Sequence, residues 1–183
     1  MQTISEPEVI ANALLYVVNH TRSPDCHRVA KVLYLADKLH LERYGFPITG
    51  DKYIKMCYGP VPSVTYDAIK SLAGKSHSKH SETAQLVAKE LSGALIVKGN
   101  SLEATREADV GELSQSMTDC LDEIIGQYDT LSFDTITDIT HDAAWNKAAM
   151  HKEIPIESIV ENLEGSEDIL AYLRDPYGIG RTV

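Results

Sequence analysis

The stretch between Ser23 and Gly45 constrains the fold more than any other part of the sequence. Apolar residues recur along it three and four positions apart: Val29, Val32, Leu33, Ala36 and Leu39. This spacing places them on one stripe of an α-helix. Ser23 as N-cap and Pro24 at the first helical position predict where the helix begins. Gly45 predicts that it ends near Tyr44. A helix of this length needs other elements to cover its stripe, so we expect a helical core.

Helical spacing also follows the sequence Ser5-Glu6-Pro7-Glu8, which matches a capping box, and continues to about His20. Further helices are predicted at about 63–72, 112–128, 132–137, 142–150, 157–163 and 166–174. Two strands, 94–98 and 101–105, are joined by Gly99 and Asn100, which tolerate the positive φ of a tight turn. The segment 53–58 is a third extended candidate. The polar segment 74–83 is expected to be a mobile surface loop.

These elements predict an α+β fold that is predominantly helical. A length of 183 residues suits a single domain with one core. We expect about seven helices with a small antiparallel β-hairpin or a three-stranded sheet, whose third strand would come from the segment 53–58.

Acidic residues are concentrated in one part of the chain. The formal net charge is −10, and residues 101–142 contain 11 Asp and Glu but a single Arg. Residues 1–100 contain 12 Lys and Arg against 9 Asp and Glu. An acidic segment repels phosphate, so direct DNA binding is not expected and a protein partner with a basic surface is favoured. The alternative is that these acids form an ordinary solvated helix face.

The sequence lacks the features of membrane, secreted and metal-binding proteins. No apolar run reaches the roughly 20 residues of a membrane span, and the N-terminus has no signal-peptide pattern, so we expect a cytoplasmic protein. Its three cysteines lie far apart and are expected to be buried as small hydrophobic residues. His77 and His80 have no further ligand at metal-binding spacing. The same holds for Cys26 and His27, so neither a metal nor another cofactor is expected.

Catalytic motifs such as a Gly-rich phosphate loop, a nucleophile elbow or a zinc-protease His pair are absent from the sequence. Two segments nevertheless carry noteworthy polar residues. The first is the long helix, where the simplest interpretation packs the Tyr34 ring in the core and pairs Lys38 with Glu42 on the surface. The second is Tyr58-Gly59-Pro60-Val61-Pro62, where two prolines fix a rigid corner that begins a helix. A structural turn is favoured there over a binding site.

Four segments resemble, in order, the signature of the SocA-like antitoxin family, whose domain is also called Panacea and is known from phage-associated proteins: 31–44 (KVLYLADKLHLERY), 45–51 (GFPITGD), 58–62 (YGPVP) and 141–145 (HDAAW). The resemblance implies that residues 1–155 form a SocA-like domain and that 156–183 form a C-terminal helical extension packed on it. It assigns these motif residues to the scaffold: Lys31, Tyr34, Leu35, Asp37, Tyr58, Gly59, Pro60, Val61, His141 and Trp145. Trp145 is expected to be a core anchor beside the helix 31–44, and His141 to cap or hydrogen-bond nearby.

Members of this family neutralise a cognate toxin by binding it, so the resemblance implies an antitoxin and not an enzyme. One alternative is a proteolytic adaptor that delivers the toxin to a ClpXP-type protease. Another is a small hydrolase that uses His141 with Asp142 or Asp37, although no motif places a nucleophile beside them. The signature begins close to the N-terminus, so an attached DNA-binding module is not expected. A homodimer is left open.

An acidic face would steer and pair with the basic site of a toxin that acts on nucleic acid. We therefore hypothesise that the toxin contacts the segment 112–142 together with the C-terminal stretch 157–177. The residues predicted to take part are Asp119, Asp122, Glu123, Glu157, Glu161, Tyr172 and Tyr177. The two tyrosines would supply aromatic anchors, unless they pack onto the domain itself.

Overall fold

The computed structural model describes residues 5–75 and 81–175, and these residues form a predominantly helical α+β domain. Three helices form its centre: α1 (Pro7–His20), α2 (Cys26–Tyr44) and α5 (Gln115–Tyr128). The other helices are α3 (Ser63–Leu72), α4 (Glu82–Leu91), α6 (Phe133–Thr140), α7 (Ala143–Lys147), α8 (Ile156–Val160), α9 (Ser166–Arg174) and the short 3₁₀-helix η1 (Val110–Glu112). The predicted fold class is confirmed, with nine α-helices among the described residues where about seven were expected.

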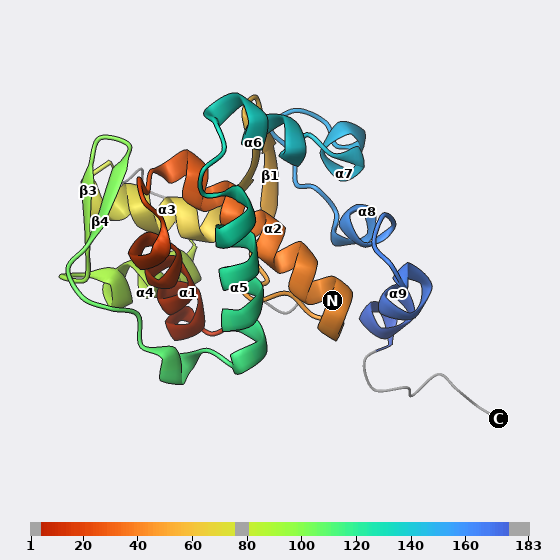
Figure 1. Cartoon of the computed structure of the whole chain (residues 1–183), viewed down its shortest axis with the longest axis horizontal. Coiled ribbons are helices and arrows are strands. Elements are labelled where there is room, and N and C mark those ends of the chain that lie inside the picture. The colour runs from red at the N-terminus through yellow and green to blue at the C-terminus, as the bar shows by residue number, and fades with distance from the viewer. Residues whose placement is uncertain (1–4, 76–80, 176–183) are drawn as a thin grey trace.

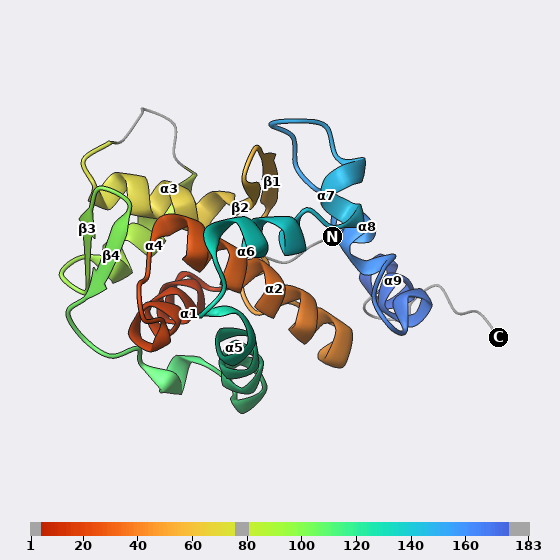
Figure 2. The ribbon, with the colours of Figure 1, turned by 45° about the horizontal axis from the view of Figure 1, so that its top comes forward.

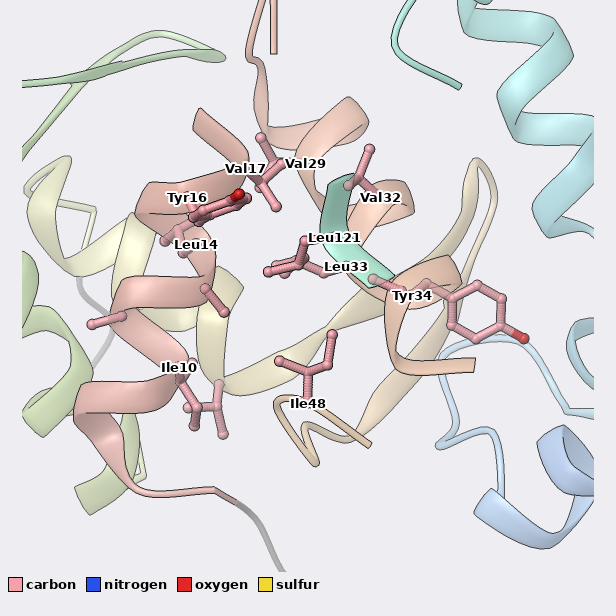
Figure 3. Packing of buried hydrophobic residues seen from close by; sticks show 14 of the residues in the cluster. Ile10, Leu14, Tyr16, Val17, Val29, Val32, Leu33, Tyr34, Ile48 and Leu121 are labelled. Atoms are coloured by element: carbon pink, nitrogen blue, oxygen red, sulfur yellow. The ribbon is translucent and has the colours of Figure 1, made fainter. Parts of the chain in front are cut away.

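The helix α2 runs through the middle of the molecule (Figure 1). Leu14 of α1, Leu33 of α2 and Leu121 of α5 lie in one apolar cluster (Figure 3). Tyr34, the next residue along α2, is a fully buried member of the same cluster, as predicted for its ring, and its side chain leaves α2 in another direction from that of Leu33. Residues 29–37 are buried without a break, although the sequence predicted a single buried stripe. Because α2 is enclosed on several sides, its polar residues are buried as well and need partners inside the protein.

The N-terminus of α2 differs from the prediction. Asp25 is the N-cap in place of Ser23, and its carboxylate accepts a hydrogen bond from the Arg28 N–H at 2.8 Å. The backbone just before Asp25 does not enter the helix, because Pro24 O accepts a hydrogen bond from the Leu102 N–H at 2.9 Å. This pairing with a strand fixes the start of α2 two residues later than the sequence predicted.

Other helix ends follow the sequence only in part. Gly45 ends α2 as predicted, with a φ of +81°. Ser5 does not cap α1, because its hydroxyl donates to Ile48 O at 2.6 Å. At α9 the N-cap is Gly165, and Ser166 is already the first helical residue. The end of α2 therefore follows the local sequence, whereas Ser5 is held away from its capping position by a contact with the distant Ile48.

The predicted hairpin at Gly99 and Asn100 is confirmed as β3 (Leu95–Lys98) and β4 (Ser101–Ala104), an antiparallel pair. The segment 53–58 does not join it. It contributes β1 (Tyr53–Met56), which pairs with β2 (Gly59–Pro62). The expected three-stranded sheet is therefore wrong, and the described residues contain two separate two-stranded sheets.

The rigid corner was predicted for 58–62, and all of it except Tyr58 is a strand. Proline has no N–H, which suits β2 to the edge of a sheet. The other edge of β1 is covered from the C-terminal part of the chain: Ile154 N–H donates to Tyr53 O at 2.7 Å. Cys57 and Tyr58 form the exposed turn of this hairpin.

Helix α4 is absent from the sequence-based prediction. Ser81 caps it by accepting a hydrogen bond from the Ala84 N–H at 3.1 Å. Its buried face consists of Ala84, Val87, Ala88 and Leu91. Of the loop predicted for 74–83, residues 76–80 lie outside the described residues, and the prediction is wrong for Glu82 and Thr83, which belong to α4. The apolar spacing of this helix and its serine cap were signals that the sequence offered.

The β3–β4 hairpin and α9 lie at opposite ends of the longest dimension (Figure 1). Helix α8 joins the main core through Ile156, Ile159 and Val160, all buried. No helix within the described ranges is both long enough and apolar enough to span a membrane. The expectation of three buried cysteines is wrong for Cys57, which is exposed, whereas Cys26 is half-buried and Cys120 is buried.

Candidate partner-binding site

Lys31 lies on α2 with 1% of its surface exposed. Its Nζ donates a hydrogen bond to Pro60 O at 2.9 Å and so ties β2 to the central helix. Burial disfavours the charged form and lowers the pKa of Lys31 to about 7. Gly59 precedes Pro60 with a φ of +97°, and it leaves the space that the end of this side chain occupies.

Asp37 is the second buried charge on α2. It accepts hydrogen bonds from the Thr49 N–H at 2.8 Å, from the Thr49 hydroxyl, and from the Tyr53 hydroxyl at 2.8 Å. Burial raises the pKa of Asp37 to about 6, although these hydrogen bonds act in the opposite direction. The carboxylate therefore fixes both the loop after α2 and the start of β1.

Asp51 caps α3 from the loop that precedes β1. Its carboxylate accepts hydrogen bonds from the Val64 N–H at 2.9 Å and from the Thr65 N–H at 2.8 Å. These are free N–H groups at the N-terminus of α3, where no side chain of the adjoining residue caps the helix. The loop before β1 thus determines where α3 begins.

Asp142 joins α2 to α7. It is the N-cap of α7 and accepts a hydrogen bond from the Trp145 N–H at 3.0 Å. Its other oxygen accepts from the Tyr34 hydroxyl at 2.9 Å and from Lys38 Nζ. The predicted Lys38–Glu42 ion pair is therefore wrong, because Lys38 pairs with a carboxylate 104 positions away.

Trp145 packs against β1 and is half-buried. Its Nε1 donates to Met56 O at 3.2 Å, and Lys55 Nζ lies 4.0 Å from the ring centroid. His141 stacks on the other side, with ring centroids 3.7 Å apart. These contacts place Trp145 against β1, whereas the sequence predicted a core anchor beside the helix 31–44. Burial lowers the pKa of His141, and its Nε2 has no hydrogen-bond partner among the described residues.

Tyr58 is an exposed aromatic residue at the tip of the β1–β2 hairpin, with 64% of its surface accessible. Its ring meets Phe133 of α6 edge-on, with centroids 5.5 Å apart. Phe133 in turn stacks on His27 at 3.9 Å. Sequence reasoning assigned Tyr58 to the scaffold and did not select Phe133. The other motif residues lie inside or at the edge of the fold: Leu35 and Pro60 are buried and Val61 is half-buried.

The acids predicted on α5 have partners within the chain. Asp122 accepts a hydrogen bond from the Tyr16 hydroxyl at 2.8 Å, and the pKa of Tyr16 is raised to about 12, by burial and then by this contact. Glu123 forms an ion pair with Arg43 at 2.7 Å. Asp119 is exposed, and it accepts from Gln115 at 2.7 Å within α5 itself. Two of the three predicted contact residues therefore also hold α5 against α1 and α2.

The family model described as "Antitoxin SocA-like, Panacea domain" matches residues 29–146. The chain belongs to the SocA-like antitoxin family. The matched residues begin inside α2 and end inside α7, and they include all four segments of the predicted signature. No curated protein and no solved structure matches the chain.

Past the matched region of the Panacea domain, Glu157 of α8 and Tyr172 of α9 are both exposed, and Tyr172 has 51% of its surface accessible. Glu161 is exposed and forms an ion pair with Lys147. Tyr177 lies outside the described residues. The C-terminal residues predicted to contact a partner are thus on the surface where they are described, but they lie on α8 and α9, apart from α5.

Membership of an antitoxin family indicates a non-enzymatic role. Both acids of the hydrolase alternative have hydrogen-bond partners within the protein. Asp142 is occupied by Tyr34 and Lys38, and Asp37 is enclosed by its own hydrogen bonds. Among the described residues, no three His, Cys, Asp or Glu side chains are grouped so that they could hold a metal ion. His77 and His80 lie outside the described residues.

Proposed function

We propose that this chain is an antitoxin that neutralises a cognate toxin by binding it directly through the surface formed by α5 and α6. The observation that carries the proposal is that no Lys or Arg occurs between Arg106 and Lys147 in a member of an antitoxin family. Helices α5 and α6 follow one another in the sequence and both pack against α2 (Figure 2). Their exposed carboxylates favour a partner with a basic face.

Blocking such a partner requires only occupation of its active surface. A toxin that acts on nucleic acid needs basic residues to bind phosphate. An acidic protein seated on those residues competes with the nucleic acid. A surface whose elements are held by internal hydrogen bonds also loses less conformational entropy on binding. For α5, the bonds of Asp122 to Tyr16 and of Glu123 to Arg43 supply that rigidity, and for α6 the 3.0 Å contact between His27 Nε2 and the Thr137 hydroxyl does so.

Co-expression with the product of the neighbouring gene tests the proposal. That product should arrest growth when expressed alone, and co-expression of this chain should restore growth. The two purified proteins should elute together from a size-exclusion column, and their affinity should fall as salt is added, since salt screens exposed charges. A neighbour that is not silenced, or that is silenced without physical contact, would contradict the proposal.

Charge reversal on the exposed acids tests the surface itself. Asp119→Lys combined with Asp134→Lys changes two carboxylates that hold no other element in place. We expect this variant to weaken toxin binding by about tenfold or more, mainly through slower association. Glu90→Lys on α4 is the matched control and should bind like the wild type. Equal binding by all three proteins would place the interface elsewhere.

The half-life of the toxin separates neutralisation from delivery to a protease. Under the proposal, the toxin persists in cells as an inactive complex, whether or not a ClpXP-type protease is present. A toxin that disappears only when both this chain and the protease are present would instead identify an adaptor.

A further inference from the structure

The rings of Tyr58, Phe133 and His27 contact one another in a row that we call the aromatic stack: the half-buried His27 stacks on Phe133, and the exposed rings of Phe133 and Tyr58 meet edge-on. We infer that the aromatic stack, together with the carboxylates of Asp134 and Asp138 on the same helix as Phe133, is the anchor point for the toxin and receives an arginine- or lysine-bearing segment of it. This inference rests on the proposed function and specifies where on the surface the binding energy is concentrated.

Two of the three rings are exposed on the surface. Tyr58 and Phe133 have 64% and 44% of their surface accessible. Aromatic residues are over-represented among the few side chains that dominate protein interfaces, because they bury a large area at a small cost in conformational entropy. The contact of the two rings with each other makes them one apolar feature shared by the hairpin tip and α6.

The tip of the β1–β2 hairpin is held in place through both of its strands. Tyr58 follows Cys57 in a two-residue turn between β1 and β2. Two residues later, on β2, Pro60 O accepts a hydrogen bond from the buried Lys31, and on β1 Lys55 Nζ donates to Ala148 O at 3.0 Å. The turn is therefore anchored on both strands, and the ring of Tyr58 is presented in a fixed place before any partner arrives.

The charges on α6, the helix that carries Phe133, indicate the partner's chemistry. Asp134 and Asp138 lie four residues apart on α6 and are both exposed. Within the part of the chain that the structure describes, neither carboxylate has an ion-pair partner. This distinguishes them from Asp122 and Glu123 of α5, whose carboxylates already bind Tyr16 and Arg43. A guanidinium or ammonium group can stack on an aromatic face and pair with an adjacent carboxylate at the same time.

Substitution of single residues in the full-length chain tests the inference, with affinity for the purified product of the neighbouring gene measured by calorimetry. Tyr58→Ala and Phe133→Ala should each raise Kd by about 10- to 100-fold. Tyr58→Phe keeps the ring and should stay within about threefold of the wild type. Asp134→Asn with Asp138→Asn should lower the dependence of Kd on salt.

Two further aromatic residues serve as controls. Tyr66→Ala removes an exposed ring on α3 and should leave Kd unchanged. Tyr172→Ala removes the exposed ring on α9 and tests the competing C-terminal surface. Thermal unfolding of each variant checks that it is folded. If Tyr58→Ala is destabilised, the Kd of Tyr58→Phe still shows whether the ring without its hydroxyl is sufficient for binding. If Phe133→Ala is destabilised, Phe133→Leu removes the ring but keeps an apolar side chain on α6, and its Kd can be measured in its place.

The outcomes distinguish this inference from the proposed function. If the wild-type chain neither binds nor silences the toxin, the proposed function fails and the inference fails with it. If the wild type binds and folded Tyr58→Ala and Phe133→Ala bind equally well, the inference alone is overturned. Loss of binding in Tyr172→Ala but not in Tyr58→Ala would also overturn it and would place the anchor on α9.

Discussion

The side chain of Lys31 fills the space that a β-carbon on Gly59 would need. Such a carbon would lie 2.8 Å from Lys31 Cε and 2.8 Å from Thr140 Oγ1. Neither neighbour can move freely, because Lys31 donates to Pro60 O and Thr140 donates to backbone carbonyls of α6. One glycine therefore allows the β1–β2 hairpin, the centre of α2 and the end of α6 to meet at one point.

Gly59→Ala should destabilise the protein by about 3 kcal/mol, through crowding of Lys31 and Thr140 and through the cost of a φ of +97° for alanine. Gly93→Ala is the matched control, since Gly93 also has a positive φ, +76°, but nothing lies within 4 Å of the added carbon. The control should lose only about 1 kcal/mol. Urea unfolding measures the loss of stability in both variants. Equal losses would show that Lys31 and Thr140 move aside at little cost.

Lys31→Met should remove part of the dependence of stability on pH. The pKa of Lys31 is about 7 in the folded protein and near 10.5 in an unfolded chain. Between these values the unfolded chain binds one more proton, so stability rises with pH, by up to about 1.4 kcal/mol per unit. Below about pH 7 both states carry the proton, and the full cost of burying the charge is present.

The measurement for Lys31→Met is urea unfolding of both proteins between about pH 7.5 and 9.5. The stability of the wild type minus that of the variant should increase with pH, because the titration of other groups is common to both proteins. A difference that stays constant over this range would show that Lys31 titrates as an ordinary surface lysine.

Asp51→Ala should cost about 2 to 4 kcal/mol, because two N–H groups of α3 and the Thr65 hydroxyl would lose their acceptor in a buried place. Asp67→Ala, a partly exposed acid on α3 itself, should cost about 0.5 kcal/mol or less. Thermal unfolding monitored by circular dichroism compares the two. If both substitutions had the same small effect, Asp51 would not be the residue that caps α3.

Trp145→Ala should cost about 2 kcal/mol, less than a fully buried tryptophan would, because the ring is only half-buried between His141 and Lys55. Trp145→Phe keeps a stacking ring but loses the hydrogen bond to Met56 O, and should cost about 1 kcal/mol. Chemical unfolding of both variants gives the comparison. Loss of a fully buried tryptophan ring costs about 4 kcal/mol. A loss of that size in Trp145→Ala would therefore indicate the core position that the sequence predicted.

Features that depend on neighbours along the chain could be predicted. The apolar spacing of residues 10–18 and 29–39 predicted α1 and α2, and Gly45 predicted where α2 ends. Gly99 and Asn100 predicted the β3–β4 turn. The ordered segments of the signature predicted the SocA-like family, which the match to residues 29–146 confirms. In each case the spacing or conformational freedom within a few residues carries the information.

Contacts between distant residues were decided by the tertiary structure alone. Asp25 caps α2 because the preceding backbone pairs with β4, and Lys38 pairs with Asp142 and not with the nearby Glu42. Lys31 and Asp37 are buried because α2 is covered on several sides. A buried polar group takes whichever partner the packed elements bring near it. For Lys31 that partner is 29 positions away and for Tyr34 it is 108, separations that no local periodicity can encode.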